Sequence, residues 1–394
     1  MDILSLIGRS SPLFDKDLEN VETELSKVVS TSSFLVLGGA GSIGQAVVKE
    51  IFCRNPLKLH VVDLNENNLA ELVRDIRSSF GYIPGDFQTF ALDIGSSIYD
   101  AFIHSDGKFD FVLNLSALKH VRSEKDPFTL MRMIEVNILN TEKTIQQSIQ
   151  KGTKKYFCVS TDKAANPVNL MGASKRIMEH FLLNRSTEIE ISTARFANVA
   201  FSDGSLLLGF ENRVKKNQPI VAPSDVKRYF ITPQESGQLC LLSCVFGNNR
   251  DVFFPKMSEH DLISFSDLAI KYLENKGFEV ALCVDEEEAR QKVKHATYSN
   301  EYPCLFTVSD TTGEKEVEEF YTVNEKVDLN RFQGIGIIKN NANPNQRELN
   351  YFLDQISKMR KENKWQKTEL VSLFQELIPE MNYLDTGKYL DSKM

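Results

Sequence analysis

The sequence predicts an α/β fold in which helices cover both faces of a mostly parallel, doubly wound sheet. Short apolar runs alternate with longer amphipathic segments from residue 34 to about residue 194. A glycine-rich turn follows the first run, and an acidic side chain follows each of the next two. The 394 residues are 42% hydrophobic and 25% charged, which is ordinary for a globular protein large enough for two lobes.

The first strand, expected at residues 34–37, leads into three regularly spaced glycines and a helix over residues 42–52. In this arrangement the first glycine permits a tight turn, and the second lets the backbone approach a pyrophosphate. The third lets helix and strand pack closely. The free amides at the helix N-terminus would face the phosphate. The pattern predicts a Rossmann-type dinucleotide site with backbone contacts at Gly38, Gly41, Ser42, Ile43 and Gly44.

A second strand over residues 57–62 ends at Asp63, which lies 19 residues beyond Gly44. A carboxylate at this position accepts hydrogen bonds from the adenosine ribose hydroxyls and would repel a 2′-phosphate. We therefore expect NAD rather than NADP as the cofactor. The alternative interpretation, that Asp63 only caps the next helix, is weaker in this context.

Two further strands are expected to complete the first half of the sheet, at residues 87–92 and 109–115. The exit of the earlier strand would face the adenine, although its aspartate could equally cap the next turn. The exit of the later strand would lie beside the nicotinamide half. A single long helix is expected over residues 127–150. The cofactor candidates at these exits are Asp93, Ile94, Ser116 and Ala117.

A fifth strand at residues 155–159 is followed directly by Ser160, Thr161, Asp162 and Lys163. Ligands bind beyond the carboxyl ends of parallel strands, so a hydroxyl, a carboxylate and an amine would leave the sheet together at the ligand site. A helix beginning near Met171 places Lys175 one turn further on the same face. The plainer alternative is a polar strand end followed by a capped helix.

The sixth strand is expected at residues 189–194. Beyond it the regular alternation fades, and a turn at Gly204 and Ser205 would suit contact with a phosphate. The basic pairs at 215–216 and 227–228 stand near aromatic residues, as a diphosphate with a stacked base would require. A solvated basic face explains the same pairs equally well.

Composition excludes several classes of function. The net charge of −8 and a pI near 5.5 argue against nucleic acid or an anionic membrane as a partner. The apolar run at 239–246 is far too short to span a membrane, and no export signal is visible at the N-terminus. Six scattered cysteines suggest free thiols in a reducing cytoplasm, and six dispersed histidines suggest no metal site.

Several longer motifs resemble the extended short-chain dehydrogenase/reductase superfamily and, within it, nucleotide-sugar 4,6-dehydratases of the polysaccharide-biosynthesis group. The resemblance covers residues 34–235. Residues 6–9 and 310–321 resemble the soluble, configuration-retaining UDP-N-acetylglucosamine 4,6-dehydratases. The motifs are the glycine pattern at 38–44, SALKH at 116–120, STDKA at 160–164, NPVNLMGASK at 166–175 and RFANV at 195–199.

One residue departs from the superfamily pattern. The usual helix residue is a tyrosine whose phenol takes the substrate hydroxyl proton, and here Met171 stands in its place. Methionine has no proton to exchange. The resemblance to the retaining branch, which also carries methionine, implies that water or a neighbouring group replaces the phenol.

The resemblance implies a three-step reaction on one bound sugar: oxidation at C4, loss of water across C5 and C6, and return of the hydride to C6. It implies Asp162, protonated, as the acid at the C6 hydroxyl and Lys163, neutral, as the base at C5. Thr161 would bond the C4 oxygen, and Lys175 would hold the cofactor ribose. The implied substrate contacts are Lys119, His120, Asn198, Ser205 and Arg228.

Several alternatives stay open at this point. An inverting 4,6-dehydratase or a C4 epimerase would share most motifs, although Met171 speaks against an epimerase. A catalytically silent NAD-binding module would explain Met171, and Asp162 with Lys163 would then be an ion pair capping the loop. The expected organisation is a helical lead-in (1–30), an NAD-binding domain (31–200), a nucleotide-sugar lobe (201–340) and a helical tail (341–394), in a homo-oligomer.

Overall fold

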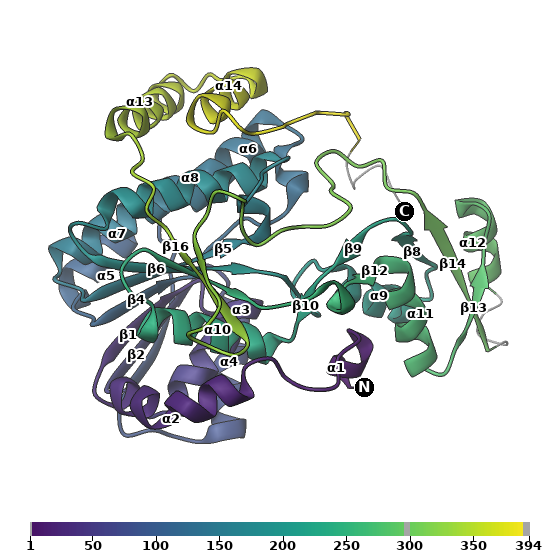
Figure 1. Cartoon of the computed structure of the whole chain (residues 1–394), viewed down its shortest axis with the longest axis horizontal. Coiled ribbons are helices and arrows are strands. Elements are labelled where there is room, and N and C mark those ends of the chain that lie inside the picture. The colour runs from purple at the N-terminus through teal and green to yellow at the C-terminus, as the bar shows by residue number, and fades with distance from the viewer. Residues whose placement is uncertain (1, 295–299, 389–394) are drawn as a thin grey trace.

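The computed structural model describes residues 2–294 and 300–388 and is built around one nine-stranded sheet (Figure 1). Seven neighbouring strands run parallel, and β16 pairs antiparallel with β11 at one side. In spatial order the strands are β15 (Val327–Asp328), β16 (Ile335–Lys339), β11 (Asp251–Pro255), β6 (Glu190–Phe196), β5 (Lys155–Thr161), β4 (Phe111–Asn114), β1 (Ser33–Leu37), β2 (Lys58–Asp63) and β3 (Asp86–Ala91).

The strand order confirms the Rossmann-type, doubly wound fold. The chain moves outward from β1 to β3 and then returns to place β4 on the other side of β1, with Leu37 opposite Asn114. At this reversal the connections leave in opposite directions and open a crevice beyond the carboxyl ends of β1 and β4. The apolar residues of β1 are at most 1% exposed because helices cover both faces.

Helices form a layer on each side of the sheet (Figure 1). Close packing is visible where Gly237 of one helix faces Ala46 of another, because a Cβ at Gly237 would lie 2.6 Å from the Ala46 carbonyl carbon. One layer contains α2 (Asp15–Ser30), α3 (Ser42–Phe52), α4 (Glu66–Phe80) and α10 (Pro233–Phe246). The other contains α5 (Ser97–Asp106), α6 (Pro127–Ile134), α7 (Asn140–Gln150) and α8 (Leu170–Arg185).

The single helix expected over residues 127–150 is wrong in one detail, because a π-helical segment, Glu135–Leu139, separates α6 from α7. The wider turn carries the buried Asn137, which bonds both backbone groups of Leu118 at 2.9 and 3.0 Å. Its amide also donates to Ser174 Oγ of α8 at 2.9 Å. The irregular turn thus ties the loop after β4 to the helix after β5.

A smaller lobe stands at one end of the sheet (Figure 1). It contains a parallel sheet of β8 (Ile220–Pro223), β14 (Glu301–Thr307) and β13 (Glu279–Leu282), with α9 (Leu206–Lys215), α11 (Phe265–Asn275) and α12 (Glu286–Val293). The main sheet also takes β11, β15 and β16 from the range 201–340 that we assigned to the nucleotide-sugar lobe. The apolar residues of β11 and β16 are buried there, which accounts for their return to the main sheet.

The C-terminal tail forms two helices, α13 (Gln346–Glu362) and α14 (Lys367–Leu377), that lie over α6 and α8 (Figure 1). Phe352 and Phe374 of this pair join Met171 of α8 in one buried apolar cluster. The indole of Trp365 donates to the carbonyl of Pro127 at 2.9 Å. The tail therefore braces the dinucleotide-binding half from outside.

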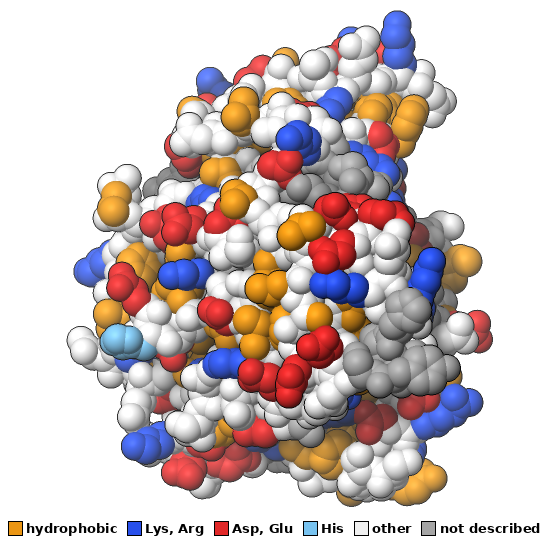
Figure 2. All heavy atoms as spheres, turned by 90° about the vertical axis from the view of Figure 1, so that its right-hand side faces the viewer, with side chains coloured by type: hydrophobic (Ala, Val, Ile, Leu, Met, Phe, Trp, Pro, Cys, Tyr) orange, Lys and Arg blue, Asp and Glu red, His pale blue; other side chains and the backbone are white. Residues whose placement is uncertain are grey.

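The surface has no extended field of one charge on the face that Figure 2 shows, where acidic and basic side chains are interspersed with hydrophobic ones. Within residues 2–294 and 300–388, no helix is both long and apolar enough to cross a bilayer.

Candidate functional site

A cavity of about 270 Å³ lies beyond the carboxyl ends of β1, β2 and β4. It opens at the place where the strand order reverses, which is the ligand-binding position of open α/β sheets. Of the predicted cofactor residues, the structure places Gly38, Gly41, Asp63, Asp93, Ile94, Ser116 and Ala117 in its lining.

The glycine turn explains the shape of this cavity. Gly38 has φ +73°, and a Cβ there would lie 2.7 Å from the Ser116 nitrogen. A Cβ at Gly44 would lie 2.2 Å from the Gly38 carbonyl oxygen. Among the described residues, a Cβ at Gly41 would approach a single atom, the Gly38 carbonyl oxygen, at 3.6 Å. Gly38 and Gly44 therefore serve internal packing, and Gly41 leaves room for a ligand. Over residues 2–294 and 300–388, no side chain caps the N-terminus of α3, so its first amides are available to an anion.

Asp63 holds the glycine turn in place. Its carboxylate accepts hydrogen bonds from the Ala40 and Asn65 amides, each at 2.9 Å. The cap of α4 is Asn65, whose side chain accepts from Asn68 N. Asp63 therefore faces the cavity and is not the helix cap that the alternative interpretation required. Asp93 bonds the amide of Gly95 at 2.8 Å.

Thr161, Asp162 and Lys163 leave the sheet together at the end of β5, beside the exit of β4. One oxygen of Asp162 accepts from Thr161 Oγ1 at 2.8 Å, from the Lys163 amide at 2.8 Å and from Lys163 Nζ at 3.1 Å. Asp162 is buried, and its pairing with Lys163 is the ion pair that the alternative interpretation describes. The structure thus brings the predicted acid and base into direct contact.

Glu318 is a buried carboxyl that the sequence analysis missed. Its Oε1 lies 3.7 Å from Lys163 Nζ and 3.9 Å from the Arg228 guanidinium. Burial raises the pKa of Glu318. Burial opposes the charge of Lys163, but Asp162 and Glu318 outweigh that effect and raise the pKa of Lys163. A raised pKa favours the ammonium form of Lys163, in contrast to the neutral base that the resemblance implies.

The segment carrying Glu318 is fastened to the start of α8. Asn169 caps that helix by accepting from the Gly172 amide at 2.7 Å, and its own amide donates to the Gly313 carbonyl at 2.9 Å. A Cβ at Gly172 would lie 2.4 Å from the Lys163 carbonyl oxygen. The close packing at Gly172 and the bond to Gly313 bring residues 313–318 over the exit of β5. Only the acidic character of 314–319 hinted at this in the sequence.

Met171 and Lys175 are both buried on α8. Met171 packs in the apolar cluster with the C-terminal tail. Lys175 donates to the carbonyl of Val159 at 3.0 Å, and burial lowers the pKa of its amine. Lys175 thus contacts the backbone of β5 near its carboxyl end.

The predicted substrate residues fall into two groups. Lys119 donates to Ser202 Oγ at 3.2 Å, and the ring of His120 lies against Gly204, where a Cβ would be 2.4 Å from its Cε1. Burial lowers the pKa of both Lys119 and His120. Asp203 of the same loop bonds Ser42 at the start of α3. This loop therefore spans the gap between the β4 exit and the glycine turn.

Of the other three substrate candidates, Ser205 and Arg228 are engaged within the protein, whereas among the described residues the buried side-chain nitrogen of Asn198 has no hydrogen-bond partner. Ser205 caps α9 by accepting from the Leu208 amide. Asn198 lies in the short strand β7 (Asn198–Val199). Arg228 is 3% exposed, pairs with Glu314 and donates to the carbonyls of residues 227, 315 and 316. Arg228 anchors the segment that carries Glu318, a role that the sequence did not indicate.

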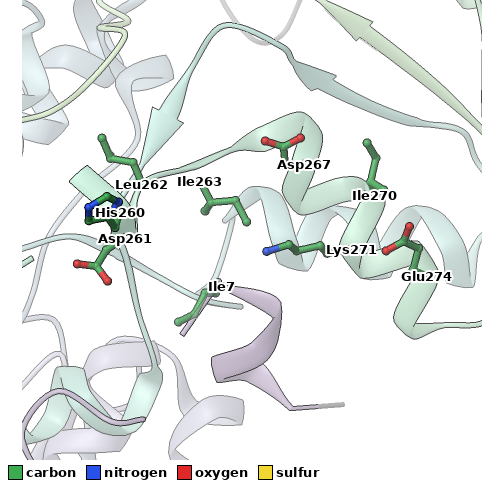
Figure 3. Close-up of a pocket in the computed structure, with 10 residues that line it drawn as sticks. Ile7, His260, Asp261, Leu262, Ile263, Asp267, Ile270, Lys271 and Glu274 are labelled. Atoms are coloured by element: carbon green, nitrogen blue, oxygen red, sulfur yellow. The ribbon is translucent and has the colours of Figure 1, made fainter. Parts of the chain in front are cut away.

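A larger cavity, of about 410 Å³, lies away from these residues (Figure 3). Figure 3 shows Ile7 at the end of α1 (Ile3–Leu6) facing His260 and Asp261 on one side and Lys271 of α11 on the other. None of the predicted site residues lines it. The candidate site is therefore the smaller cavity together with the adjoining exit of β5.

Comparison with known proteins finds several relatives. An uncharacterized membrane protein of Methanocaldococcus jannaschii is 31% identical over 63% of this chain and 75% of its own length. The probable polysaccharide biosynthesis protein EpsC of Bacillus subtilis is 27% identical over 69% of this chain and 44% of its own. A UDP-glucose 4-epimerase of Rickettsia bellii is 28% identical over 57% and 66%. The chain spans less than half the length of EpsC.

Solved structures share the fold. Pen from Bacillus thuringiensis has a TM-score of 0.64 at 22% identity, covering 79% of this chain and 88% of its own. DesIV of Streptomyces venezuelae, a dTDP-glucose 4,6-dehydratase solved with NAD bound, has a TM-score of 0.55 at 16% identity over 73% and 87%. The family model described as "Polysaccharide biosynthesis protein" matches residues 34–339, and the chain therefore belongs to this polysaccharide biosynthesis protein family.

Proposed function

We propose that this protein is an NAD-dependent 4,6-dehydratase of a nucleotide sugar. The observation that carries the proposal is the cluster of Thr161, Asp162 and Lys163 at the exit of β5, next to the strand whose end lines the dinucleotide cavity. A carboxyl and an amine in contact supply the two proton-transfer groups that elimination of water requires. The substrate we favour is UDP-N-acetylglucosamine with retention at C5, on the resemblance of residues 310–321.

The residues of the cavity fit a dinucleotide. Gly41 leaves open space at the uncapped N-terminus of α3, which suits a pyrophosphate. Asp63 carries a carboxylate into the same cavity, where it would meet the adenosine ribose hydroxyls. Ser116 and Ala117 would flank the nicotinamide half, with Lys175 toward its ribose. When bound, NAD+ would accept the hydride from C4 of the sugar and later return it to C6.

The protein groups divide the proton transfers between them. Thr161 would bond the C4 oxygen, and Asp162, protonated, would give its proton to the departing C6 hydroxyl. Lys163, as a neutral amine, would remove the C5 proton, which the C4 ketone makes acidic. Met171 carries no exchangeable proton, so water or a neighbouring group would take the proton of the C4 hydroxyl.

A C4 epimerase is the second candidate, and the similarity to the Rickettsia bellii protein favours it. An epimerase oxidises C4 and reduces the same carbon again, so it needs neither an acid at C6 nor a base at C5. The contact between Asp162 and Lys163 would then be without use in the reaction. For that reason we place the dehydratase first.

The test is incubation of the purified protein with NAD+ and UDP-N-acetylglucosamine in D2O, followed by NMR. A 4-keto-6-deoxy product supports the dehydratase, and its configuration at C5 separates retention from inversion. A C4 epimer would support the epimerase instead. Absence of any turnover would favour a catalytically silent NAD-binding module.

A further inference from the structure

Glu318 is a buried carboxyl to which the proposed reaction assigns no part. Its side chain is 2% exposed, and Oε1 lies 3.7 Å from Lys163 Nζ. Among the residues the structure describes, no group forms a hydrogen bond with its Oε2. The ammonium of Lys315 lies 3.9 Å from that oxygen. A buried carboxylate oxygen without a hydrogen bond is costly, and a proton on the carboxyl would relieve that cost.

The two carboxyls beside Lys163 differ in their ability to take a proton. One oxygen of Asp162 already accepts three hydrogen bonds, from Thr161 Oγ1, the Lys163 amide and Lys163 Nζ, so the lone pairs of that oxygen are occupied. Within the part of the chain that the structure describes, Glu318 Oε2 accepts no hydrogen bond, and the nearby Arg228 is mostly occupied by Glu314 and by backbone carbonyls. Burial raises the pKa of Glu318 further. Glu318 is therefore the better proton acceptor of the two.

The net charge of the group of ionisable side chains around the Lys163 amine does not change when a proton moves between its members. The ionisable groups are the cations Lys163, Arg228 and Lys315 and the carboxyls Asp162, Glu314 and Glu318. Transfer from an ammonium to a neighbouring carboxylate replaces two buried charges by two neutral groups. In a buried site such neutralisation is favoured over separated charges.

We propose that Glu318 accepts the proton of the Lys163 ammonium and thereby generates the neutral amine that removes the C5 proton of the sugar. One N–H bond of Lys163 breaks, its electron pair stays on nitrogen, and an O–H bond forms on the Glu318 carboxylate. The Nζ–Oε1 separation must shorten by about 1 Å to reach hydrogen-bonding distance, or one water must bridge it. Glu318 is thus a positioning residue that acts through Lys163, and this inference rests on the proposed dehydratase function.

The experiment compares the full chain with Glu318→Gln and with Glu316→Gln, whose exposed carboxylate lies two residues away. In Glu318→Gln we expect kcat for the 4-keto-6-deoxy product to fall about 100-fold, the size typical of a lost acid–base group, with KM nearly unchanged. Absorbance at 340 nm should rise, because C4 oxidation continues while elimination is slow and the hydride stays on the cofactor. Glu316→Gln should match the wild type.

The pH profile gives a second measurement that does not depend on a variant. Since the amine and carboxyl exchange a proton internally, kcat/KM of the wild type should be flat over the neutral range. Glu318→Gln should instead gain about tenfold in rate per pH unit toward alkaline pH, because its amine must lose the proton to solvent.

Several results would overturn the inference. They are an unchanged or faster Glu318→Gln enzyme at neutral pH, a loss of product without a rise at 340 nm, and a wild-type rate that itself climbs tenfold per pH unit. A wild type that turns over while Glu318→Gln is unaffected rejects only the role of Glu318. A wild type with no turnover on UDP-N-acetylglucosamine rejects the proposed function along with it.

Discussion

Arg195 holds together the elements on which the candidate site is built, and its replacement by methionine should lower the free energy of unfolding. All five of its N–H donors are used. Two bond Glu179 of α8 at 3.0 and 2.8 Å, two bond Glu325 at 2.8 Å, and one bonds the carbonyl of Phe320 at 2.9 Å. Arg195 is fully buried, and despite burial it lowers the pKa of Glu179 to about 2.

The expected loss of free energy of unfolding follows from the groups that remain in Arg195→Met. Two carboxylates, 2% and 11% exposed, would lose their main cation, and breaking a buried pair in this way costs about 3–5 kcal/mol. Arg176 still lies 3.2 Å from both Glu179 and Glu325, so we expect the lower end, about 3 kcal/mol. Arg195→Lys keeps the charge but only three donors, so its loss should be smaller, about 1–2 kcal/mol.

The assay is urea unfolding followed by circular dichroism at pH 7, with the free energy of unfolding taken from midpoint and slope. The matched control is Arg290→Met, which removes a half-exposed ion pair with Glu286 and should cost less than about 1 kcal/mol. If Arg195→Met shifts the midpoint no more than Arg290→Met does, the buried network contributes nothing and the reasoning fails.

Three further predictions concern the cavity and the start of α8. Gly44→Ala would place a Cβ 2.2 Å from the Gly38 oxygen and should weaken NAD binding at least about tenfold, as measured by calorimetry. Gly209→Ala, which adds a Cβ in open space, should leave the affinity for NAD unchanged. Equal affinities of the two variants for NAD would contradict this prediction. Asp63→Ala should weaken NAD binding and reduce the preference for NAD over NADP. Titration with each cofactor tests this, and an unchanged ratio of the two affinities would contradict it. Glu124 accepts a hydrogen bond from the Leu170 amide at the start of α8, and burial raises the pKa of its carboxyl from 4.5 to about 7. The folded state therefore favours the protonated form, so the stabilisation that this proton provides is complete below pH 4.5 and is lost as pH rises through 7. The free energy of unfolding should fall by about 3 kcal/mol over that window in the wild type but not in Glu124→Gln, and parallel pH profiles would disprove it.

The cofactor half of the molecule could be predicted because its signals are local. The helix expected over residues 42–52 after the glycine turn is observed with the same bounds. Each of the first five strands starts within two residues of its expected first residue. The glycine spacing places Gly44 against Gly38 through backbone geometry alone.

Contacts between distant segments could not be predicted in the same way. The π-helical turn at Glu135–Leu139 depends on Asn137 finding the backbone of Leu118, which no periodic pattern encodes. The pairing of β16 with β11 joins strands separated by the smaller lobe. Arg228 was read as a possible phosphate contact, but its partners come from residues 314–316.

By itself the sequence determined the order of strands and helices, the glycine turn, the carboxylate after β2 and the adjacency of Asp162 and Lys163, because each is set by residues close together in the chain. Only the tertiary structure decided that Lys163 is held between two carboxyls. Glu318 lies in a segment without regular secondary structure, and its burial arises from the packing of residues 313–318 on the cap of α8. Since the charge state of a buried amine depends on every group that surrounds it, the chemistry of Lys163 follows from the fold and not from its neighbours in sequence.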